Sequence, residues 1–282
     1  MGISVFEIIG PIMIGPSSSH TAGMARIGMM ACRIAGDKAA SIHLALSPKM
    51  RTTYAGHRSD AALIGGAMGL RESDPEIREA VALARNRGIE TAVSFLPDGL
   101  YPQNTALITV TDRGGRATKI LGTSVGGGSI VISAVDDVQM NIRPDAYHLI
   151  VWSGGPLPEN LGKGASVQSG QNGRETVTCF TFTTMPSRER CEALRSAVGV
   201  HRMSVVEPVL EYGVSLPSEK RYASCEEVCR AAAENRMTVA EVSVEYEAAR
   251  SGRSKEAVRQ QMHRHFEQIR ESVQEGEQGS RM

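Results

Sequence analysis

A short polar segment near the N-terminus carries the residue types best suited to chemistry. An apolar run ends at Pro16 and is followed by Ser17, Ser18, Ser19, His20 and Thr21. Apolar residues then recur at helical spacing from Met24 to Ile34, so the segment stands at the N-terminus of a predicted helix. Unpaired N–H groups and the positive dipole end at such a position bind carboxylates or phosphates. We therefore expect a small anion here, with one serine capping the helix and His20 beside the anion.

Two other interpretations of this segment compete with anion binding. Three consecutive serines are also typical of a solvated linker, in which His20 is an exposed first-turn residue. The apolar segments on both sides argue against a linker. A serine nucleophile activated by His20 is the other possibility, but chain neighbours seldom direct their side chains at each other. The chain also lacks a G-x-S-x-G motif, so we rank this mechanism low.

A second histidine precedes another predicted helix. His57 lies in a loop that ends at Ser59 or Asp60, and either residue can cap the helix predicted at 61–70. Capping of this helix would by itself account for the presence of Asp60 without a role in binding. A histidine placed like His57 either reaches into a cleft or bonds to its own loop, and the sequence does not distinguish these. Because histidine titrates near neutral pH, His20 and His57 are the candidate general bases.

A glycine triplet separates two predicted strands, 115–123 and 129–135. Glycines at 126–128 permit positive φ or close approach of the backbone to a ligand, so Gly126 and Gly127 are candidate binding residues. The triplet is not a P-loop, because no Gly-Lys-Ser/Thr follows it. A strained connection between strands explains it equally well.

Composition narrows the classes of partner. Lys plus Arg and Asp plus Glu number 31 each, and aromatic residues make up 4% of the 282 residues, so we expect no nucleic-acid partner. No apolar run reaches the roughly 18 residues of a membrane span, and no signal peptide is recognisable. The five cysteines are scattered and form no C-x-x-C pair. We therefore expect a cytoplasmic protein with reduced thiols and no metal site of its own.

The remaining elements predict an α/β (α+β) fold of two or three units. Predicted helices cover 19–35, 61–70, 75–87 and 187–198, and the other predicted strands cover 41–47, 90–95, 105–112, 147–152, 175–184 and 203–206. Residues 153–166 are too rich in glycine and proline for a good helix. A linker at 211–222 leads to three tail helices that begin at Ser224, at a Thr238/Glu241 capping box and at Ser254.

Three motifs, in this order, resemble the β subunit or β domain of iron–sulfur-dependent L-serine dehydratases (L-serine ammonia-lyases). They are GPIMIGPSSSHTAGMARIG at 10–28, TYAGHRSDAALIGG at 53–66 and GTSVGGGSI at 122–130. The resemblance implies a β-type substrate-binding domain at 1–145. It implies a degenerate ACT-like βαββαβ unit, with its first helix shortened or lost, at 146–210. Residues 211–282 resemble the helical start of the α subunit but end before its cluster-binding cysteines.

The resemblance also implies a reaction. Members of this family eliminate water from L-serine to give aminoacrylate, then pyruvate and ammonia, and a [4Fe–4S] cluster acts on the serine hydroxyl. By resemblance, His20 and His57 are the candidate bases, and the substrate-binding residues are Ser17, Ser18, Ser19, Thr21, Asp60, Gly126 and Gly127. The cluster then belongs to a separate α-type chain, in a homo- or hetero-oligomer.

Departures from the family pattern keep alternatives open. The usual G-H-G-T-D reads Gly56-His57-Arg58-Ser59-Asp60 here, so Arg58 either adds a carboxylate contact or blocks the pocket. Tyr101 replaces a histidine that often precedes Pro102. A non-catalytic module that binds L-serine or a hydroxy acid, like the sensing domain of some phosphoglycerate dehydrogenases, is the main alternative, and a split remnant is a third. The choice of base, the choice between L-serine and L-threonine, and ligand binding by the ACT-like unit stay open.

Overall fold

The computed structural model describes residues 4–36, 39–157, 162–210, 222 and 224–279. It contains two compact units, one formed by residues 13–211 and the other by residues 1–12 together with 212–282. The start of the chain therefore belongs with its tail and not with the motif that it precedes. Apart from Tyr222, the linker predicted at 211–222 lies outside the described residues.

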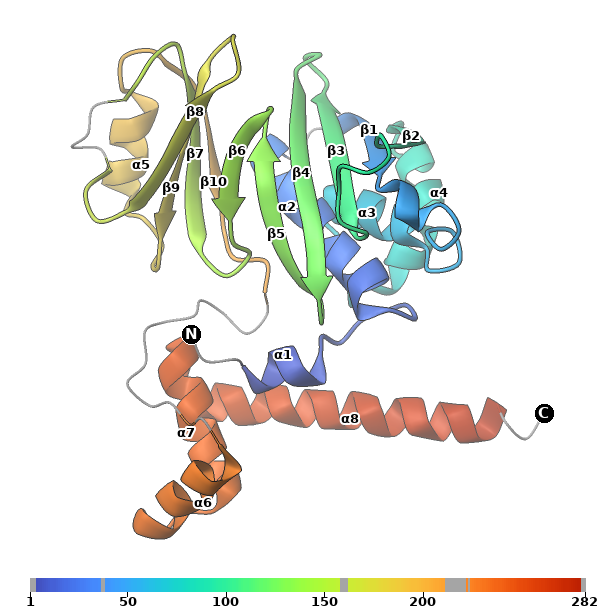
Figure 1. Cartoon of the computed structure of the whole chain (residues 1–282), viewed down its shortest axis with the longest axis vertical. Helices are drawn as coiled ribbons and strands as arrows, with labels where there is room; N and C mark the ends of the chain where they lie inside the picture. Colours follow the sequence, from blue (N-terminus) through green and yellow to red (C-terminus); the bar gives the residue numbers. More distant parts are fainter. Residues whose placement is uncertain (1–3, 37–38, 158–161, 211–221, 223, 280–282) are drawn as a thin grey trace. The chain divides into compact units, whose positions relative to one another are not determined.

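A six-stranded sheet forms the centre of the larger unit (Figure 1). Its order is β2-β1-β3-β4-β5-β6; β1 and β2 are parallel, and the other neighbours are antiparallel. The strands are β1 (Ala39–Leu46), β2 (Glu90–Phe95), β3 (Thr105–Asp112), β4 (Ala117–Gly126), β5 (Ser129–Val135) and β6 (Val138–Ile142). The pairing Thr105↔Thr123 and Leu46↔Ala106 brings the end of β1, the start of β3 and the end of β4 to one edge.

Helices cover one face of this sheet (Figure 1). They are η1 (Ser18–Ala22), α2 (Gly23–Ala35), η2 (Pro48–Met50), α3 (Ser59–Ala67), η3 (Pro75–Glu79) and α4 (Ala80–Asn86). The predicted apolar stripe of α2 is fully buried at Met24, Ile27, Ala31 and Ile34. The predicted helix 19–35 is thus correct in its extent, but it opens with one π-helical turn, η1, before the α-helix begins.

Two glycines allow α2 and α3 to cross at backbone contact. A Cβ added to Gly28 would lie 2.2 Å from the carbonyl oxygen of Leu63, and one added to Gly66 would lie 2.0 Å from that of Ala25. No flexible side chain can move aside at either place, since the obstacle is backbone. The two helices that carry the histidine motifs are therefore held at a fixed separation.

We expect Gly28→Ala to lower the free energy of unfolding by about 1–3 kcal/mol, because the added methyl group forces the two helices apart. Urea denaturation followed by circular dichroism measures this change. Gly154→Ala is the matched control, since a Cβ there meets no atom within 4 Å and should leave stability nearly unchanged. Equal midpoints for both variants would contradict the close crossing.

A second sheet completes the larger unit. Its order is β10-β7-β9-β8, with antiparallel neighbours throughout. It consists of β7 (Tyr147–Ser153), β8 (Ser166–Gln171), β9 (Thr176–Phe182) and β10 (Val200–Val206), and α5 (Arg188–Arg195) lies on one face. The described residues of 153–166 form no α-helix, as predicted, whereas the sequence analysis missed β6 and β8. The ACT-like assignment and the boundary at 145 stay predictions.

The two sheets share one core. Leu149 and Val151 pack with Leu194 of α5, whereas their neighbours Ile150 and Trp152 belong to the core of the six-stranded sheet. This alternation is the period-two pattern of a strand that is buried on both faces. The larger unit is therefore one mixed α/β body with two sheets.

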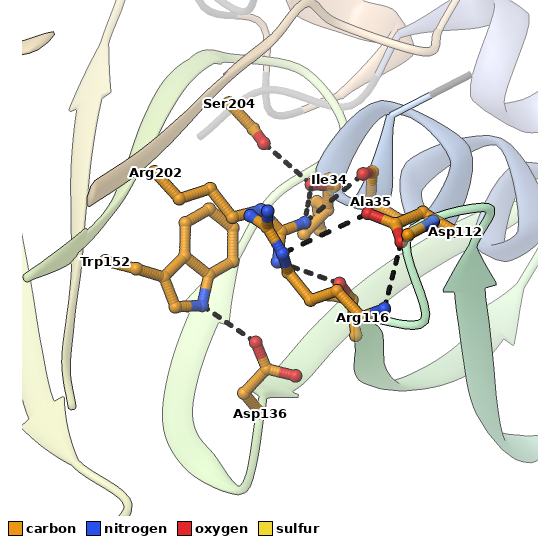
Figure 2. Close-up of polar contacts among 10 residues, drawn as sticks. Ile34, Ala35, Asp112, Arg116, Asp136, Trp152, Arg202 and Ser204 are labelled. Atoms are coloured by element: carbon orange, nitrogen blue, oxygen red, sulfur yellow. Dashed lines mark hydrogen bonds and ion pairs between the residues drawn. The ribbon is translucent and has the colours of Figure 1, made fainter. Parts of the chain in front are cut away.

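A polar network joins the small sheet to the C-terminal end of α2 (Figure 2). The Arg202 guanidinium lies 3.9 Å from the centre of the Trp152 ring and donates to the Ile34 carbonyl at 3.0 Å, and Ser204 Oγ donates to the same oxygen. Trp152 Nε1 donates to Asp136 Oδ2, and burial raises the pKa of Asp136. A cation at a helix C-terminus interacts favourably with the negative end of the helix dipole. A guanidinium over an indole ring also forms a cation–π interaction. This network anchors the helix end opposite to the serine-rich motif.

The smaller unit is helical. It contains α1 (Val5–Ile9), α6 (Cys225–Glu234), α7 (Val239–Ser251) and α8 (Lys255–Gly279), and the predicted caps at Ser224 and at the Thr238/Glu241 box are confirmed. The buried Glu247 carboxylate accepts hydrogen bonds from Ser4 Oγ at 3.0 Å and from the Val5 N–H at 2.7 Å. An acceptor far along the chain thus caps α1. None of the described helices is long and apolar enough to span a bilayer.

Candidate active site

The serine-rich motif forms the predicted helix N-terminus. Ser17 is the N-cap of η1, and its Oγ accepts a hydrogen bond from the His20 N–H at 3.1 Å, which confirms the prediction that one of the serines caps this helix. The N–H groups of Ser18 and Ser19 have no acceptor among the described residues. They remain able to bind an anion at the positive end of the helix.

The His20 ring contacts side chains of its own helical turn. Its Nδ1 lies 3.2 Å from both Ser17 Oγ and Ser19 Oγ, so the expectation that neighbouring side chains avoid each other is wrong here. The reason is that an N-cap side chain folds back over the turn that it caps. Burial lowers the pKa of His20, and the nearby His57 lowers this pKa further. His20 is therefore neutral at pH 7.

The two predicted histidines lie together. The rings of His20 and His57 stack with their centroids 4.6 Å apart and an interplanar angle of 25°. Thr21 Oγ1 donates to the His57 carbonyl at 3.0 Å, which ties the two motifs together. His57 Nδ1 lies 3.0 Å from the Thr53 carbonyl oxygen. Because a carbonyl only accepts, Nδ1 carries a proton, and in the neutral tautomer Nε2 has the free lone pair.

The start of α3 differs from the prediction. Its N-cap is Arg58, without a side-chain hydrogen bond, so neither Ser59 nor Asp60 caps the helix. Arg58 adopts the left-handed conformation, with φ 52° and ψ 39°, at a cost of about 1–2 kcal/mol for a residue with a Cβ. Asp60 lies in the first turn of α3, where a negative charge is favourable. Among the described residues its carboxylate has no hydrogen-bond partner.

Buried polar atoms without a partner gather near the histidine pair. In the described part of the chain, five such atoms in the larger unit are His20 Nε2, Ser47 Oγ, Ser59 Oγ, Asn104 Oδ1 and Ser124 Oγ. Ser124 lies against Gly23, where an added Cβ would be 2.2 Å from its hydroxyl oxygen, and its N–H bonds to the Asn104 carbonyl. Buried polar atoms normally have partners, so these atoms indicate a bound polar ligand or water.

Ser59, Asn104 and Ser124 are not among the site residues that the sequence predicts. Ser59 and Ser124 lie inside quoted motifs, and the capping of a helix already explained Ser59, whereas Asn104 lies outside these motifs. Their common feature is burial without a partner, which only packing reveals.

The glycine triplet is tied to α2 rather than to the histidines. Gly126 and Gly127 have positive φ, 109° and 60°, as the sequence analysis allowed. Arg26 of α2 donates to the Gly128 carbonyl at 2.6 Å and pairs with Glu72 at 2.6 Å, and both side chains are nearly fully buried. No described hydrogen bond joins Gly126 or Gly127 to the histidine pair. Their role in substrate binding stays a prediction.

The described cysteines do not fit an iron–sulfur cluster. Cys32 and Cys179 are buried separately, Cys191 is half-buried, and Cys225 and Cys229 are exposed on α6. Burial raises the pKa of Cys179 to about 12, which keeps this thiol protonated. A cluster needs three or four thiolate ligands, and the described residues contain no group of three potential metal ligands.

Comparisons with known proteins agree with the resemblance of the motifs. No family model matches the chain. The chain is 40% identical over 150 residues to the probable L-serine dehydratase, beta chain, of Bacillus subtilis (strain 168), covering 52% of this chain and 67% of that protein. It is 30% identical over 221 residues to the L-serine dehydratase, beta chain, of Peptoniphilus asaccharolyticus, covering 73% and 97%. The second match spans nearly the whole of that relative, so the chain belongs to the L-serine dehydratase beta-chain family.

Proposed function

We propose that this chain binds L-serine and removes its α-proton as the β-type part of an L-serine dehydratase. The observation that carries the proposal is the stacked pair of His20 and His57 beside a helix N-terminus, among buried polar atoms that lack partners. The names of both relatives support L-serine as the substrate.

In this proposal the substrate carboxylate binds at the N-terminal end of η1. The N–H groups of Ser18 and Ser19 lie at the N-terminal end of the helix and, with the Ser17 hydroxyl nearby, offer hydrogen bonds to an anion. The Thr21 hydroxyl already donates to the His57 carbonyl, so Thr21 positions the two motifs around the substrate. Ser124 and Asn104, at the adjoining strand ends, supply further polar atoms for the ammonium and hydroxyl groups of the substrate. Asp60, Gly126 and Gly127 remain candidate substrate-binding residues outside this set of contacts.

His57 is the better candidate for the base. Its Nδ1–H is held by the Thr53 carbonyl, which orients the ring and stabilises the imidazolium that forms when Nε2 accepts the α-proton. His20 is a poorer proton acceptor, because burial lowers its pKa. The neutral His20 ring instead offers its buried Nε2 as a hydrogen-bonding atom to the substrate.

The remaining chemistry requires a second chain. The described cysteines do not fit a [4Fe–4S] cluster, so in this proposal an α-type chain would hold the cluster, which would supply Lewis-acid chemistry at the serine hydroxyl. The resulting aminoacrylate then gives pyruvate and ammonia.

We assign the helical tail to docking on the α-type partner. The four-stranded sheet with α5 is a degenerate ACT-like unit, and a cytoplasmic location is consistent with its free cysteines.

Reconstitution tests this function. We expect this chain, mixed anaerobically with the α-type chain of the same organism, to release pyruvate from L-serine, whereas either chain alone is at least a hundredfold slower. Pyruvate is measured with a coupled lactate dehydrogenase assay. Saturable binding of L-serine without turnover by the mixture would favour the non-catalytic binding module instead.

A further inference from the structure

A cavity of about 400 Å³ lies next to the histidine pair but is distinct from it. Arg58 and Arg78 line it together with the apolar side chains of Met13, Ile14, Ala62 and Ile77. Its volume lies within the usual range for small-molecule pockets. The cavity thus combines a cationic side with an apolar side.

The two guanidinium groups have no carboxylate partner among the described residues. Arg58 donates one hydrogen bond to the Arg78 backbone carbonyl, which holds the Arg58 side chain beside η3. Neither arginine forms an ion pair with a carboxylate in the described part of the chain. Two cations beside an apolar wall attract an anion, and a guanidinium matches a carboxylate with two parallel hydrogen bonds.

The backbone at Arg58 is unfavourable for arginine. Its φ of 52° is typical of glycine, yet this position carries a long cationic side chain. Strain of this kind persists where the surrounding structure enforces it, and it is concentrated at binding sites. Here the strain coincides with the cavity and with two arginines that form no ion pair among the described residues.

The opposite wall of the cavity is held in place. The Ile14 N–H donates to the Glu72 carbonyl at 2.7 Å, and Gly15 packs so closely on Thr21 that a Cβ would lie 2.5 Å from the threonine methyl group. Thr21 also lines the cavity, and its hydroxyl donates to the His57 carbonyl. A ligand in the cavity therefore contacts the residue that ties the two histidine motifs together.

We propose that this cavity is an anion subsite that binds a short-chain organic carboxylate, with Arg58 and Arg78 on the carboxylate and the apolar wall on the chain. The subsite does not depend on the proposed catalytic role of the histidines. Its binding can therefore be measured in the isolated chain, without a partner and without turnover.

Isothermal titration with pyruvate and with propionate tests the proposal. Propionate shares the carboxylate and the chain length of pyruvate but lacks the 2-oxo group, so it distinguishes a site for reaction products from a general carboxylate site. We expect Arg58→Gly and Arg78→Ala each to weaken binding at least tenfold. Arg58→Gly removes the guanidinium while relieving the backbone strain, so its unfolding midpoint should not fall.

Three results would overturn the proposal. They are unchanged binding in both arginine variants, equally tight binding of inorganic phosphate, and loss of binding in Arg85→Ala, an exposed arginine of α4 outside the cavity. His20→Ala should retain carboxylate binding. If His20→Ala abolishes it while Arg58→Gly does not, the carboxylate binds at the helix N-terminus, which supports the proposed function but not this subsite.

Discussion

Replacing His57 with alanine is expected to lower kcat for L-serine in the reconstituted complex by about 10²–10⁴-fold, the usual contribution of a positioned general base. The effect is on kcat because Nε2 of His57 acts on the α-proton, whereas the carboxylate binds at the N-terminus of η1. His20→Ala should mainly raise KM, since its neutral ring is assigned to binding. Steady-state kinetics of pyruvate release separates the two effects.

The control for both histidine variants is His43→Ala. His43 is a solvent-facing histidine of β1, as the sequence alternation predicted, and its side chain is 48% exposed. Its replacement should leave kcat and KM unchanged. The assignment of His57 as the base is wrong if His57→Ala keeps its kcat while His20→Ala loses it.

A histidine titration adds a test that needs no partner chain. His57 lowers the pKa of His20, although burial is the larger cause. Removing the His57 ring takes away that charge and exposes His20, so the His20 pKa should rise toward its ordinary value in His57→Ala. Protonation of His20 then begins at a higher pH than in the wild type. Two-dimensional NMR of the imidazole resonances measures the midpoint.

The largest expected effect on stability comes from Glu72. Glu72 is 5% exposed and pairs through its carboxylate with Arg26, which is 1% exposed and also donates to the Gly128 carbonyl. Glu72→Ala removes the paired carboxylate from a buried guanidinium. Breaking such a buried pair costs about 3–5 kcal/mol, and we expect this loss in denaturant unfolding at pH 7.

A double variant shows whether charge or packing is responsible. Replacing both partners, as Arg26→Met with Glu72→Leu, should recover much of the loss, because no unpaired charge remains buried. Glu192→Ala removes an exposed partner of Arg188 and should change stability by less than about 1 kcal/mol. A Glu72→Ala protein as stable as the Glu192→Ala control would contradict the role assigned to this pair.

Local features of the fold were predictable from sequence because they depend on neighbouring residues. The Ser17 cap, the buried stripe of α2 and the Thr238/Glu241 capping box follow from side chains within one or two turns of each other. The strands at 90–95 and 129–135 match their predicted bounds. The start of α3 did not, since Arg58 takes a backbone conformation that its residue type disfavours.

The tertiary structure alone decided how distant residues combine. The sequence by itself determined that His20 stands in the first turn of one helix and His57 before another, but the crossing of α2 and α3 at Gly28 and Gly66 and the bond from Thr21 to His57 bring the two histidines together. The buried position of Arg26 likewise depends on Glu72 and the turn at 126–128. Such contacts arise from packing between segments far apart in the chain. No local pattern encodes which segments meet, because close packing is a property of the whole core.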